Sequence, residues 1–328
     1  MAKISFWVGE GALFSSVAIL MDAFSIANLW HRYFTGNQQD TLFHMELLTI
    51  DGAPVEAYGG LPVMPHGAVQ DAPGTDCLVV SPCLPNITPL PGNLAALAKW
   101  IGMLRRRKTP IATSCTGTFL LAEMGLLDGK TATTNWQYAR MFQKRYPKVN
   151  LRPQHMMTED DGILCTGAAT AVYHLALYLI RLFGSGEIAG ATSKALLVDP
   201  NRKSQIPYIL SNPLKNHGDA QVLMAQQLME ENYAAIDTID TIAKKVGISP
   251  RHFKRRFKSA TGELPHKYLQ RVRIDAAKMK LETTRDTIEE ITWAVGYSDV
   301  SSFCRLFKQY TEIPPGTYRD KFFLPAAD

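Results

Sequence analysis

The strongest constraint on the fold is a pattern that occurs twice in the last third of the chain. Two segments, 242–265 and 291–315, each begin with Ile and carry a Gly five residues later. Each then has two Phe residues four positions apart, followed by Lys, Thr and a closing Pro. The copies differ in length by one residue, placed after the glycine. So many shared positions predict two copies of one structural unit.

The repeated unit has the pattern of a helix-turn-helix. Gly247 and Gly296 are suited to the left-handed conformation that a sharp turn between two helices needs. Ser249 in the first copy, and Ser298 or Asp299 in the second, are placed to cap the helix that follows. The Phe pair, spaced at i and i+4, is expected to hold one face of that helix against a core.

The opposite face of each second helix carries the candidate DNA contacts. A helix held by one face can present the other to a major groove. The expected contacts in the first copy are Arg251, Lys254 and Arg255. The expected contacts in the second copy are Val300, Ser301, Cys304 and Arg305. The alternative is a plain helical bundle with a basic face, which the duplication and the glycines make the weaker hypothesis.

Positive charge is concentrated in the same region. The whole chain has a formal net charge of +5, from 35 Lys and Arg against 30 Asp and Glu. From Lys244 to Lys280, twelve basic residues are opposed only by Glu263 and Asp275, a local net charge of +10. Such a patch predicts a polyanionic partner, here double-stranded DNA, although a solvated helical face can look similar.

These residues closely resemble the AraC/XylS family of transcription regulators. The resemblance covers about 219–322 and includes "PRHFKRRFK" and the "AVGY" pattern that ends at Tyr318 and Arg319. It implies an all-α domain in which two helix-turn-helix units are joined by a long helix, about Pro265–Leu281. It also implies that the two recognition helices enter successive major grooves. Glu312 departs from the family, which usually has Gly there, so we expect a different helix cap at that position.

Residues 1–199 alternate between short apolar runs and helix-like runs. The expected strands are 3–9, 43–50, 76–80, 110–114 and 162–166. The expected helices are 12–34, 92–106, 116–124, 135–145 and 168–183. This alternation predicts an α/β sandwich with a mostly parallel sheet covered on both faces. Ligands of such sheets bind at the carboxyl ends of the strands.

The segment 198–218 has three prolines and little periodicity, as is typical of a linker. We therefore predict a ligand-sensing and dimerisation domain at 1–199, a linker at 200–218 and a DNA-binding domain at 219–328. The apolar stretch 12–30 is long enough to suggest a membrane span, but Asp22 and Asn28 within it favour a buried helix.

The cysteines indicate the cellular setting. The chain has five, an odd number, and they are widely spaced. No CxxC motif or Cys/His cluster suggests a metal site. No signal peptide is visible. We expect a reduced, cytoplasmic protein without a membrane partner, metal or cofactor.

Cys115 lies where α/β folds often place a nucleophile. A β-prone run ends at Ser114, small residues follow, and an apolar helix includes Phe119. Such a strand–turn–helix elbow exposes a side chain beside the N–H groups of a helix start, which favour a thiolate. A nucleophile also needs a partner that transfers protons.

The first half of the chain resembles the PfpI/ThiJ-like domain, also called class I glutamine amidotransferase-like. The resemblance lies in "SCTGTFLLAEMGLLDGKTATTNW" (114–136) and "LVDPNRKSQIPY" (197–208). It is to the form that this domain takes in GlxA-type regulators, where it is fused to an AraC-type region. It implies a flavodoxin-like parallel sheet in the first domain.

The resemblance also bears on catalysis. Enzymatic relatives pair the elbow cysteine with an acid on the first helix and a nearby histidine. Ser16 stands where the acid would be, and Asn135 stands where these regulators commonly have His. Serine and asparagine cannot carry the proton in this way. We therefore expect no catalytic residue, and we expect a ligand pocket whose candidate residues are Cys115, Thr116, Ser16, Asn135 and Trp136.

An enzymatic function is the main alternative. His44, His66 and His155 remain possible bases for Cys115. A carboxylate and an imidazole within hydrogen-bond reach of its thiol would favour a cysteine-dependent amidase, or a glyoxal-detoxifying hydrolase, fused to a DNA-binding domain. A ligand-free architectural DNA-binding protein is a third possibility.

The family resemblance implies a particular set of partners. We expect a transcription regulator, an activator, that binds a DNA operator as a homodimer and acts with RNA polymerase at the promoter. The resemblance suggests an amino-acid-derived or quaternary-amine effector. An aromatic cage could hold such a cation, and the candidate rings are Trp7, Phe14, Trp136 and Tyr173.

Overall fold

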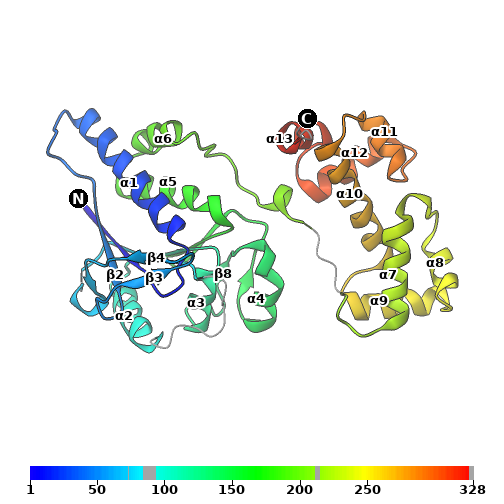
Figure 1. Ribbon diagram of the computed structural model, residues 1–328, viewed down its shortest axis with the longest axis horizontal. Coiled ribbons are helices and arrows are strands. Elements are labelled where there is room, and N and C mark those ends of the chain that lie inside the picture. The colour runs from blue at the N-terminus through cyan, green and yellow to red at the C-terminus, as the bar shows by residue number, and fades with distance from the viewer. Residues whose placement is uncertain (73, 84–93, 211–214, 325–328) are drawn as a thin grey trace. The chain divides into compact units, whose positions relative to one another are not determined.

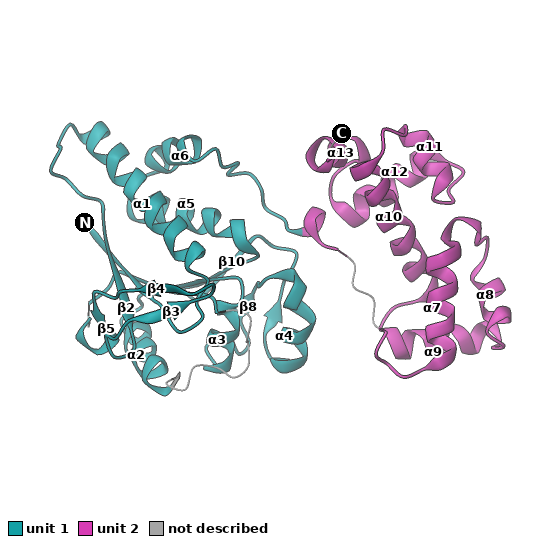
Figure 2. Ribbon diagram, in the orientation of Figure 1, with its two compact units in different colours: residues 1–205 teal, residues 206–328 magenta. Residues whose placement is uncertain are grey.

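The computed structural model describes residues 1–72, 74–83, 94–210 and 215–324. The chain divides into two compact units, 1–205 and 206–328 (Figure 1 and Figure 2). The first unit is built on a β-sheet, whereas the described part of the second is helical.

A seven-stranded sheet forms the centre of the first unit, in the order β10-β11-β7-β6-β1-β2-β5. The strands are β1 (Ala2–Trp7), β2 (Phe43–Thr49), β5 (Gly67–Ala68), β6 (Cys77–Val80), β7 (Ile111–Ser114), β10 (Met157–Asp160) and β11 (Ile163–Thr166). Neighbouring strands are parallel except for β10 and β11. Every residue of β6, β7 and β11 is buried, as expected for strands covered on both faces. The predicted parallel α/β architecture is confirmed.

Helices cover both faces of this sheet (Figure 1). One layer contains α1 (Phe14–Thr35), α5 (Val172–Phe183) and α6 (Gly186–Ala195). The other layer contains α2 (Leu94–Arg106), α3 (Gly117–Glu123) and α4 (Ala139–Arg145). Each layer has its own apolar core: Phe24 stacks on Phe43 in the first, at 4.6 Å between ring centroids, and Phe119 packs edge-on against Phe142 in the second.

Several short elements were not predicted. They are β3 (Val55–Ala57), β4 (Leu61–Val63), β5, β8 (Thr131–Ala132), β9 (Asn150–Leu151), β10 and α6. These strands have only two to four residues, too few to show a clear alternating pattern. Helix α6 is rich in Gly, Ala and Ser and so has little apolar periodicity, but Ser185 caps it by accepting a hydrogen bond from the Ile188 N–H group.

Seven α-helices form the described part of the second unit. They are α7 (Ala220–Asn232), α8 (Ile239–Lys245), α9 (Pro250–Thr261), α10 (Pro265–Thr283), α11 (Ile288–Ala294), α12 (Val300–Thr311) and α13 (Pro315–Phe322). Two apolar cores lie among them, one around Phe253 and Phe257 and the other around Phe303 and Phe307. The long helix α10 contributes to both cores, as the family resemblance implied.

The turns follow the predicted repeat, with differences in the caps. Gly247 and Gly296 have φ angles of 71° and 86°, in the left-handed region. Asp299 caps α12 by accepting a hydrogen bond from the Ser302 N–H group at 2.7 Å. Ser249 occupies the cap position of α9, but its side chain makes no capping hydrogen bond.

The expectation of a different helix cap at Glu312 is wrong. This residue ends α12 with φ 65° and ψ −7°, close to the values of Gly262 at the end of α9. The helix therefore ends with the same left-handed cap, and not with a different one. A side chain in this conformation costs about 1–2 kcal/mol, which the neighbouring structure must offset.

The chain leaves the first unit at Gln205, whose side chain is buried with 2% exposure. The Gln205 Nε2 group donates to the carbonyl oxygens of Pro153 (2.9 Å) and His155 (3.0 Å). Residues 206–210, here called the exit segment, belong to the second unit. Within that unit Lys278 Nζ donates to the carbonyl of Ile209 at 3.1 Å.

Candidate functional site

Cys115 follows the last residue of β7 in a strained backbone conformation. Its φ is 52°, a left-handed value that side-chain-bearing residues seldom adopt. Its N–H group donates to the carbonyls of Thr166 (3.0 Å) and Gly167 (3.1 Å), which holds the turn. A Cβ at Gly117 would lie 2.0 Å from Thr113 Oγ1, so the start of α3 requires glycine. These features define a strand–turn–helix elbow.

The elbow thiol has an amide partner. Asn135 Nδ2 donates to Cys115 Sγ at 3.6 Å, and Asn135 Oδ1 accepts from the Gln137 N–H group at 3.0 Å. Thr134 Oγ1 donates to the Cys115 carbonyl at 2.7 Å. Among the residues that the structure describes, no carboxylate or imidazole is hydrogen-bonded to this thiol. Trp136 follows Asn135 and is partly buried.

The first turn of α1 is anchored near the same edge of the sheet. Ser16, in that turn, is 6% exposed. The Leu13 N–H group donates to the carbonyl of Pro82 at 2.8 Å. Thr116 Oγ1 donates to the next carbonyl, that of Cys83, at 3.1 Å. The structure thus connects the segments that carry Ser16 and Thr116 through residues 82–83.

The three candidate bases have other environments. His66 Nδ1 accepts a hydrogen bond from the Leu47 N–H group at 3.0 Å. His44 is exposed on β2. His155 lines a separate cavity, described below. Among the described residues, none of these three histidines forms a hydrogen bond with Cys115.

The proposed aromatic cage is not assembled from all four rings. Trp7 is 1% exposed and packs in the core under α2 and α3. Phe14 packs against the core on the other face of the sheet, with α1 and α5. Rings in these two cores cannot enclose one cation.

The remaining cysteines of the first unit are inert by burial. Burial raises the pKa of Cys77, Cys83 and Cys165 to about 12, and Asp76 adds to this effect at Cys77. At neutral pH these thiols are protonated, which fits their role as small packing groups.

Helix α9 has the two faces that the sequence predicts. Phe253 and Phe257 are fully buried. Arg251, Lys254 and Arg255 are exposed. The helix is therefore held by its aromatic face and presents a basic face to solvent.

Helix α12 repeats this arrangement with fewer charges. Phe303 and Phe307 are fully buried. Of the candidate contacts, those exposed are Ser301 and Arg305, and those partly exposed are Val300 and Cys304. Arg305 is oriented by a hydrogen bond from its Nη2 to Ser302 Oγ at 3.1 Å.

Part of the basic charge serves the packing of the unit itself. Arg256 pairs with Asp219 at 2.6 Å, and Arg271 pairs with Glu263 at 2.5 Å. Two further internal cations are Arg273 and Lys278, which donate to backbone carbonyl groups. The local net charge of +10 therefore overstates the charge that is available to DNA.

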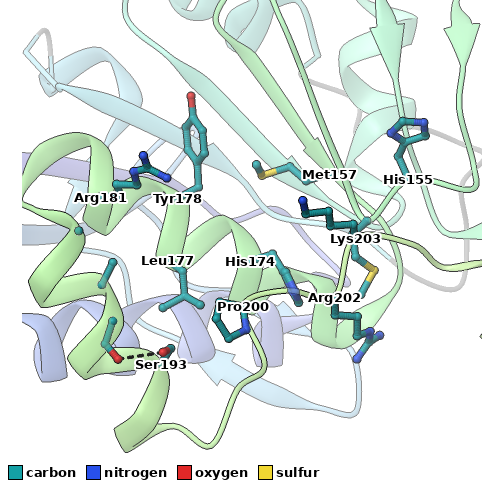
Figure 3. A pocket seen from close by; sticks show the side chains of 14 residues that line it. His155, Met157, His174, Leu177, Tyr178, Arg181, Ser193, Pro200, Arg202 and Lys203 are labelled. Carbon is teal, nitrogen blue, oxygen red and sulfur yellow. Dashed lines mark hydrogen bonds between the residues drawn. The ribbon is translucent and has the colours of Figure 1, made fainter. Parts of the chain in front are cut away.

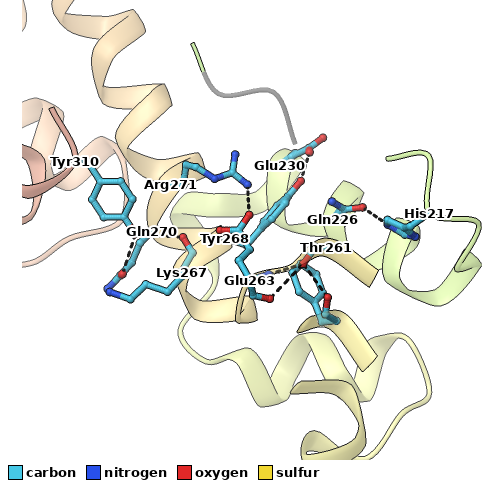
Figure 4. A network of polar contacts seen from close by, with 11 residues as sticks. His217, Gln226, Glu230, Thr261, Glu263, Lys267, Tyr268, Gln270, Arg271 and Tyr310 are labelled. Carbon is cyan, nitrogen blue, oxygen red and sulfur yellow. Dashed lines mark hydrogen bonds and ion pairs between the residues drawn. The ribbon is translucent and has the colours of Figure 1, made fainter. Parts of the chain in front are cut away.

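The helix that follows each helix-turn-helix carries a buried tyrosine, and the sequence pattern was not read as pairing the two. Tyr268 donates to Glu230 and Tyr318 donates to Glu282, both at 2.5 Å (Figure 4 shows the first). Burial and the glutamate raise the pKa of each tyrosine. The signal was present, because each tyrosine lies three residues after the proline that closes its repeat.

Contacts within the second unit fix the two helix-turn-helix units relative to each other. The Arg273 guanidinium donates to the carbonyl of Tyr233 and lies over the Tyr297 ring, 5.1 Å from its centroid. Tyr310 of α12 donates to Gln270 of α10 at 3.4 Å (Figure 4). The spacing of the two recognition helices is therefore built into this unit.

Comparison with known proteins supports this description. Residues 242–321 match the family of the helix-turn-helix domain. The HTH-type transcriptional regulator CdhR of Pseudomonas aeruginosa is 27% identical, over 87% of this chain and 83% of its own length. The HTH-type transcriptional regulator Rv1931c of Mycobacterium tuberculosis is 37% identical, over 69% of this chain and 88% of its own length.

A solved structure resembles the first unit. An AraC family transcriptional regulator from Pseudomonas putida is 20% identical, with a TM-score of 0.51, over 60% of this chain and 100% of that chain. A PfpI-like α/β unit followed by two helix-turn-helix units defines a class of DNA-binding transcription regulators. Within that class, this chain belongs to the GlxA-type branch of the AraC family.

The apolar stretch 12–30 forms most of α1, which lies in the first core. In the described ranges, no helix is both long and apolar enough to cross a membrane.

Proposed function

We propose that this regulator binds a small metabolite in its first unit and recognises a double-stranded DNA operator with α9 and α12. The observation that carries the proposal is the matched pair of recognition helices, each with a buried Phe pair and an exposed polar face. The proposed DNA contacts are Arg251, Lys254, Arg255, Val300, Ser301, Cys304 and Arg305. The family suggests a homodimer that activates transcription with RNA polymerase.

We place the effector at the elbow, in a pocket that includes Cys115, Thr116, Ser16, Asn135 and Trp136. The support is the position of the elbow at the carboxyl ends of parallel strands, where ligands of this fold bind. An amino-acid-derived or quaternary-amine effector remains the class that the family suggests. We assign no catalytic role to Cys115, because its thiol contacts an amide that can neither accept nor deliver the required proton.

The DNA-binding half of the proposal is tested by footprinting the full chain on its operator. Each protomer should protect two sub-sites about 10–10.5 base pairs apart, because two recognition helices enter successive major grooves. A single compact sub-site per protomer would contradict the model of two recognition helices.

The sensing half is tested by a thermal-shift screen of metabolites on the full chain. A ligand that raises the unfolding temperature should lose this effect in Cys115→Trp and keep it in Cys115→Ser, which preserves the shape of the elbow. Operator binding without ligand should be the same in both variants. A full ligand response in Cys115→Trp would move the sensing site elsewhere.

One observation favours the enzymatic alternative, namely the strained backbone of Cys115, since such strain is common at active sites. Multiple turnover of an amide, ester or glyoxal substrate by the wild type, abolished in Cys115→Ser, would establish an amidase or hydrolase activity. We expect no turnover.

A further inference from the structure

A cavity lies in the first unit, lined by α5, by α6 and by residues within 155–157 and 200–203. Its volume is about 720 Å³, which is within the range of small-molecule sites. Five of its lining residues carry basic or imidazole side chains: Arg181, Arg202, Lys203, His155 and His174. None of the lining residues that the structure describes is acidic. Met156, Met157, Leu177 and Pro200 supply apolar surface.

Two cations of this cavity, Arg181 and Lys203, are available to a ligand. Arg181 and Lys203 form no ion pair with any residue that the structure describes, whereas Arg105 and Arg145 in the same unit do. Arg202 is oriented by Thr170, whose Oγ1 accepts from its Nη2 at 3.4 Å. Figure 3 shows Lys203 and His174 near the centre of the cavity, with Arg181 beside Tyr178 toward one end.

Two carboxylates lie nearby. Glu159 accepts a hydrogen bond from the Tyr178 hydroxyl at 2.5 Å. Asp199 accepts from the Asn201 N–H group at 2.9 Å. Each is engaged in a local hydrogen bond, and neither lines the cavity.

His174 gives an independent indication of a ligand. Its two ring nitrogens are buried and make no hydrogen bond of normal geometry with any described residue, although backbone atoms of Asp199 and Arg202 lie close. Burial lowers the pKa of His174 and Arg202 adds to this effect, whereas Asp199 and the nearby backbone groups oppose it in part. A neutral imidazole can donate to an oxygen acceptor, which would satisfy a polar group that is costly to leave unpaired.

We propose that this cavity binds a small organic anion with an apolar body, at a site separate from the elbow. Lys203 and Arg181 would contact the anionic group and the two Met residues the apolar body. The lining of the site is close in sequence to the end of the first unit. Lys203, whose carbonyl accepts a hydrogen bond from the Met156 N–H group at 3.0 Å, lies two residues before Gln205. The proposal does not depend on the function assigned to Cys115.

The test uses 1-naphthoate as the probe and 1-naphthylmethanol as its neutral counterpart, titrated into the full chain by fluorescence. We expect naphthoate to bind with a dissociation constant below about 1 mM, and the alcohol to bind at least about tenfold more weakly. No saturable naphthoate binding, or equal binding of the two compounds, would overturn the proposal.

Charge-reversal variants locate the probe. Arg181→Glu and Lys203→Glu should each weaken naphthoate binding at least about tenfold, since each replaces an attractive charge with a repulsive one. Lys194→Glu is the matched control, because Lys194 lies on the same helix as the cavity wall but lines a neighbouring groove. If all three substitutions weakened naphthoate binding equally, the effect would come from the net charge of the protein and not from this cavity. That result would overturn the proposal.

Two further measurements separate this site from the elbow and from misfolding. Cys115→Trp should bind naphthoate like the wild type, and loss of binding there would place the probe at the elbow and overturn the proposal. Lys203→Gln keeps the size of the side chain and removes only its charge. It should weaken binding while the circular dichroism spectrum and the operator affinity stay unchanged, and unweakened binding would count against the site.

Discussion

Single residues in this chain hold backbone conformations that glycine usually provides. Cys115 has φ 52° and Glu312 has φ 65°. At Cys115 the N–H group donates two hydrogen bonds that hold the turn, and a buried thiol occupies the elbow. Glu312 ends α12, so its left-handed conformation serves as a helix cap and does not mark a pocket. A left-handed residue is therefore evidence of function only when its surroundings form a site.

Replacing Glu312 by Gly should stabilise the second unit. The substitution removes a left-handed side chain worth about 1–2 kcal/mol and adds backbone entropy to the unfolded state, which leaves a net gain of roughly 0.5–1 kcal/mol. Chemical denaturation of the full chain, with the transition of the second unit assigned by a 206–328 fragment, measures the gain. The same substitution at Gln309, within the helix, should destabilise. A loss of stability in Glu312→Gly would show that its side chain makes contacts that offset the strain.

Arg255 belongs to the exposed face of α9, so its replacement should affect recognition rather than folding. Arg255→Ala should cost roughly 1–3 kcal/mol in binding to the operator and relax the preference at one base pair. Mobility shifts on the operator and on random duplexes measure both effects. Lys99→Ala, in the first unit, is the control and should change neither. Equal losses of affinity for the operator and for random DNA would mean that Arg255 contacts the phosphate backbone and not a base.

At the scale of elements, the two helix-turn-helix copies have similar cores, each built around a Phe pair, and differ in the packing of their turns. A Cβ at Gly247 would meet no atom within 4 Å. A Cβ at Gly296 would lie 2.6 Å from the carbonyl oxygen of Ala234. The second turn is thus pressed against the segment before α8, beside Arg273. This contact sets the position of one recognition helix relative to the other.

Gly247→Ala and Gly296→Ala form a matched pair that isolates this contact. Both introduce a side chain at positive φ, at a cost of about 1–2 kcal/mol. Only Gly296→Ala adds a backbone clash, for which overpacking costs roughly a further 1–3 kcal/mol. Denaturation should therefore show the larger loss in Gly296→Ala, together with weaker binding to operators of normal spacing. Similar losses of stability in the two variants would contradict the proposed role of the second turn.

The elements that sequence reasoning found are those with long periodic patterns. Helices α9 and α12 were predicted with their buried and exposed faces, because their Phe pairs repeat at helical spacing. The contact between Asn135 and Cys115 was anticipated only as a family correspondence, since nothing local relates residues twenty positions apart. Helix α6 and its cavity were missed, because small residues carry little hydrophobic signal and a cavity depends on tertiary packing.

At the scale of the whole molecule, the boundary between the units falls between two anchored residues. Gln205 Nε2 donates to the Thr134 carbonyl at 3.2 Å, and Thr134 contacts the Cys115 carbonyl. On the other side of the boundary, Tyr208 packs edge-on against Phe322, with 5.0 Å between ring centroids. Gln205, which is hydrogen-bonded to the segment that contacts Cys115, is therefore followed directly by the first residue of the second unit.

Lengthening the chain at this boundary should uncouple the two functions. An insert of six Gly and Ser residues between Gln205 and Ile206, roughly 20 Å when extended, leaves both anchors intact. Operator affinity without ligand should stay within about twofold of the wild-type value. A ligand identified by the thermal-shift screen should no longer change transcription of a reporter gene. The same insert between Asn37 and Gln38, in an exposed loop, is the control. A normal response with the boundary insert would mean that the signal does not travel through this segment.

The attachment of the exit segment implies an order of events along the operator. The segment contacts α10 through Lys278 and α13 through Phe322, and Phe322 packs against the core of the second helix-turn-helix. The first helix-turn-helix is also connected to the exit segment, through the chain that continues into α7 and through α10. We nevertheless predict that a change in the first unit acts first on the sub-site proposed for α12, because the described contacts of the exit segment are with the second helix-turn-helix. Promoters of one regulon could then differ in inducibility through base changes in a single sub-site, without a change in basal occupancy at the other.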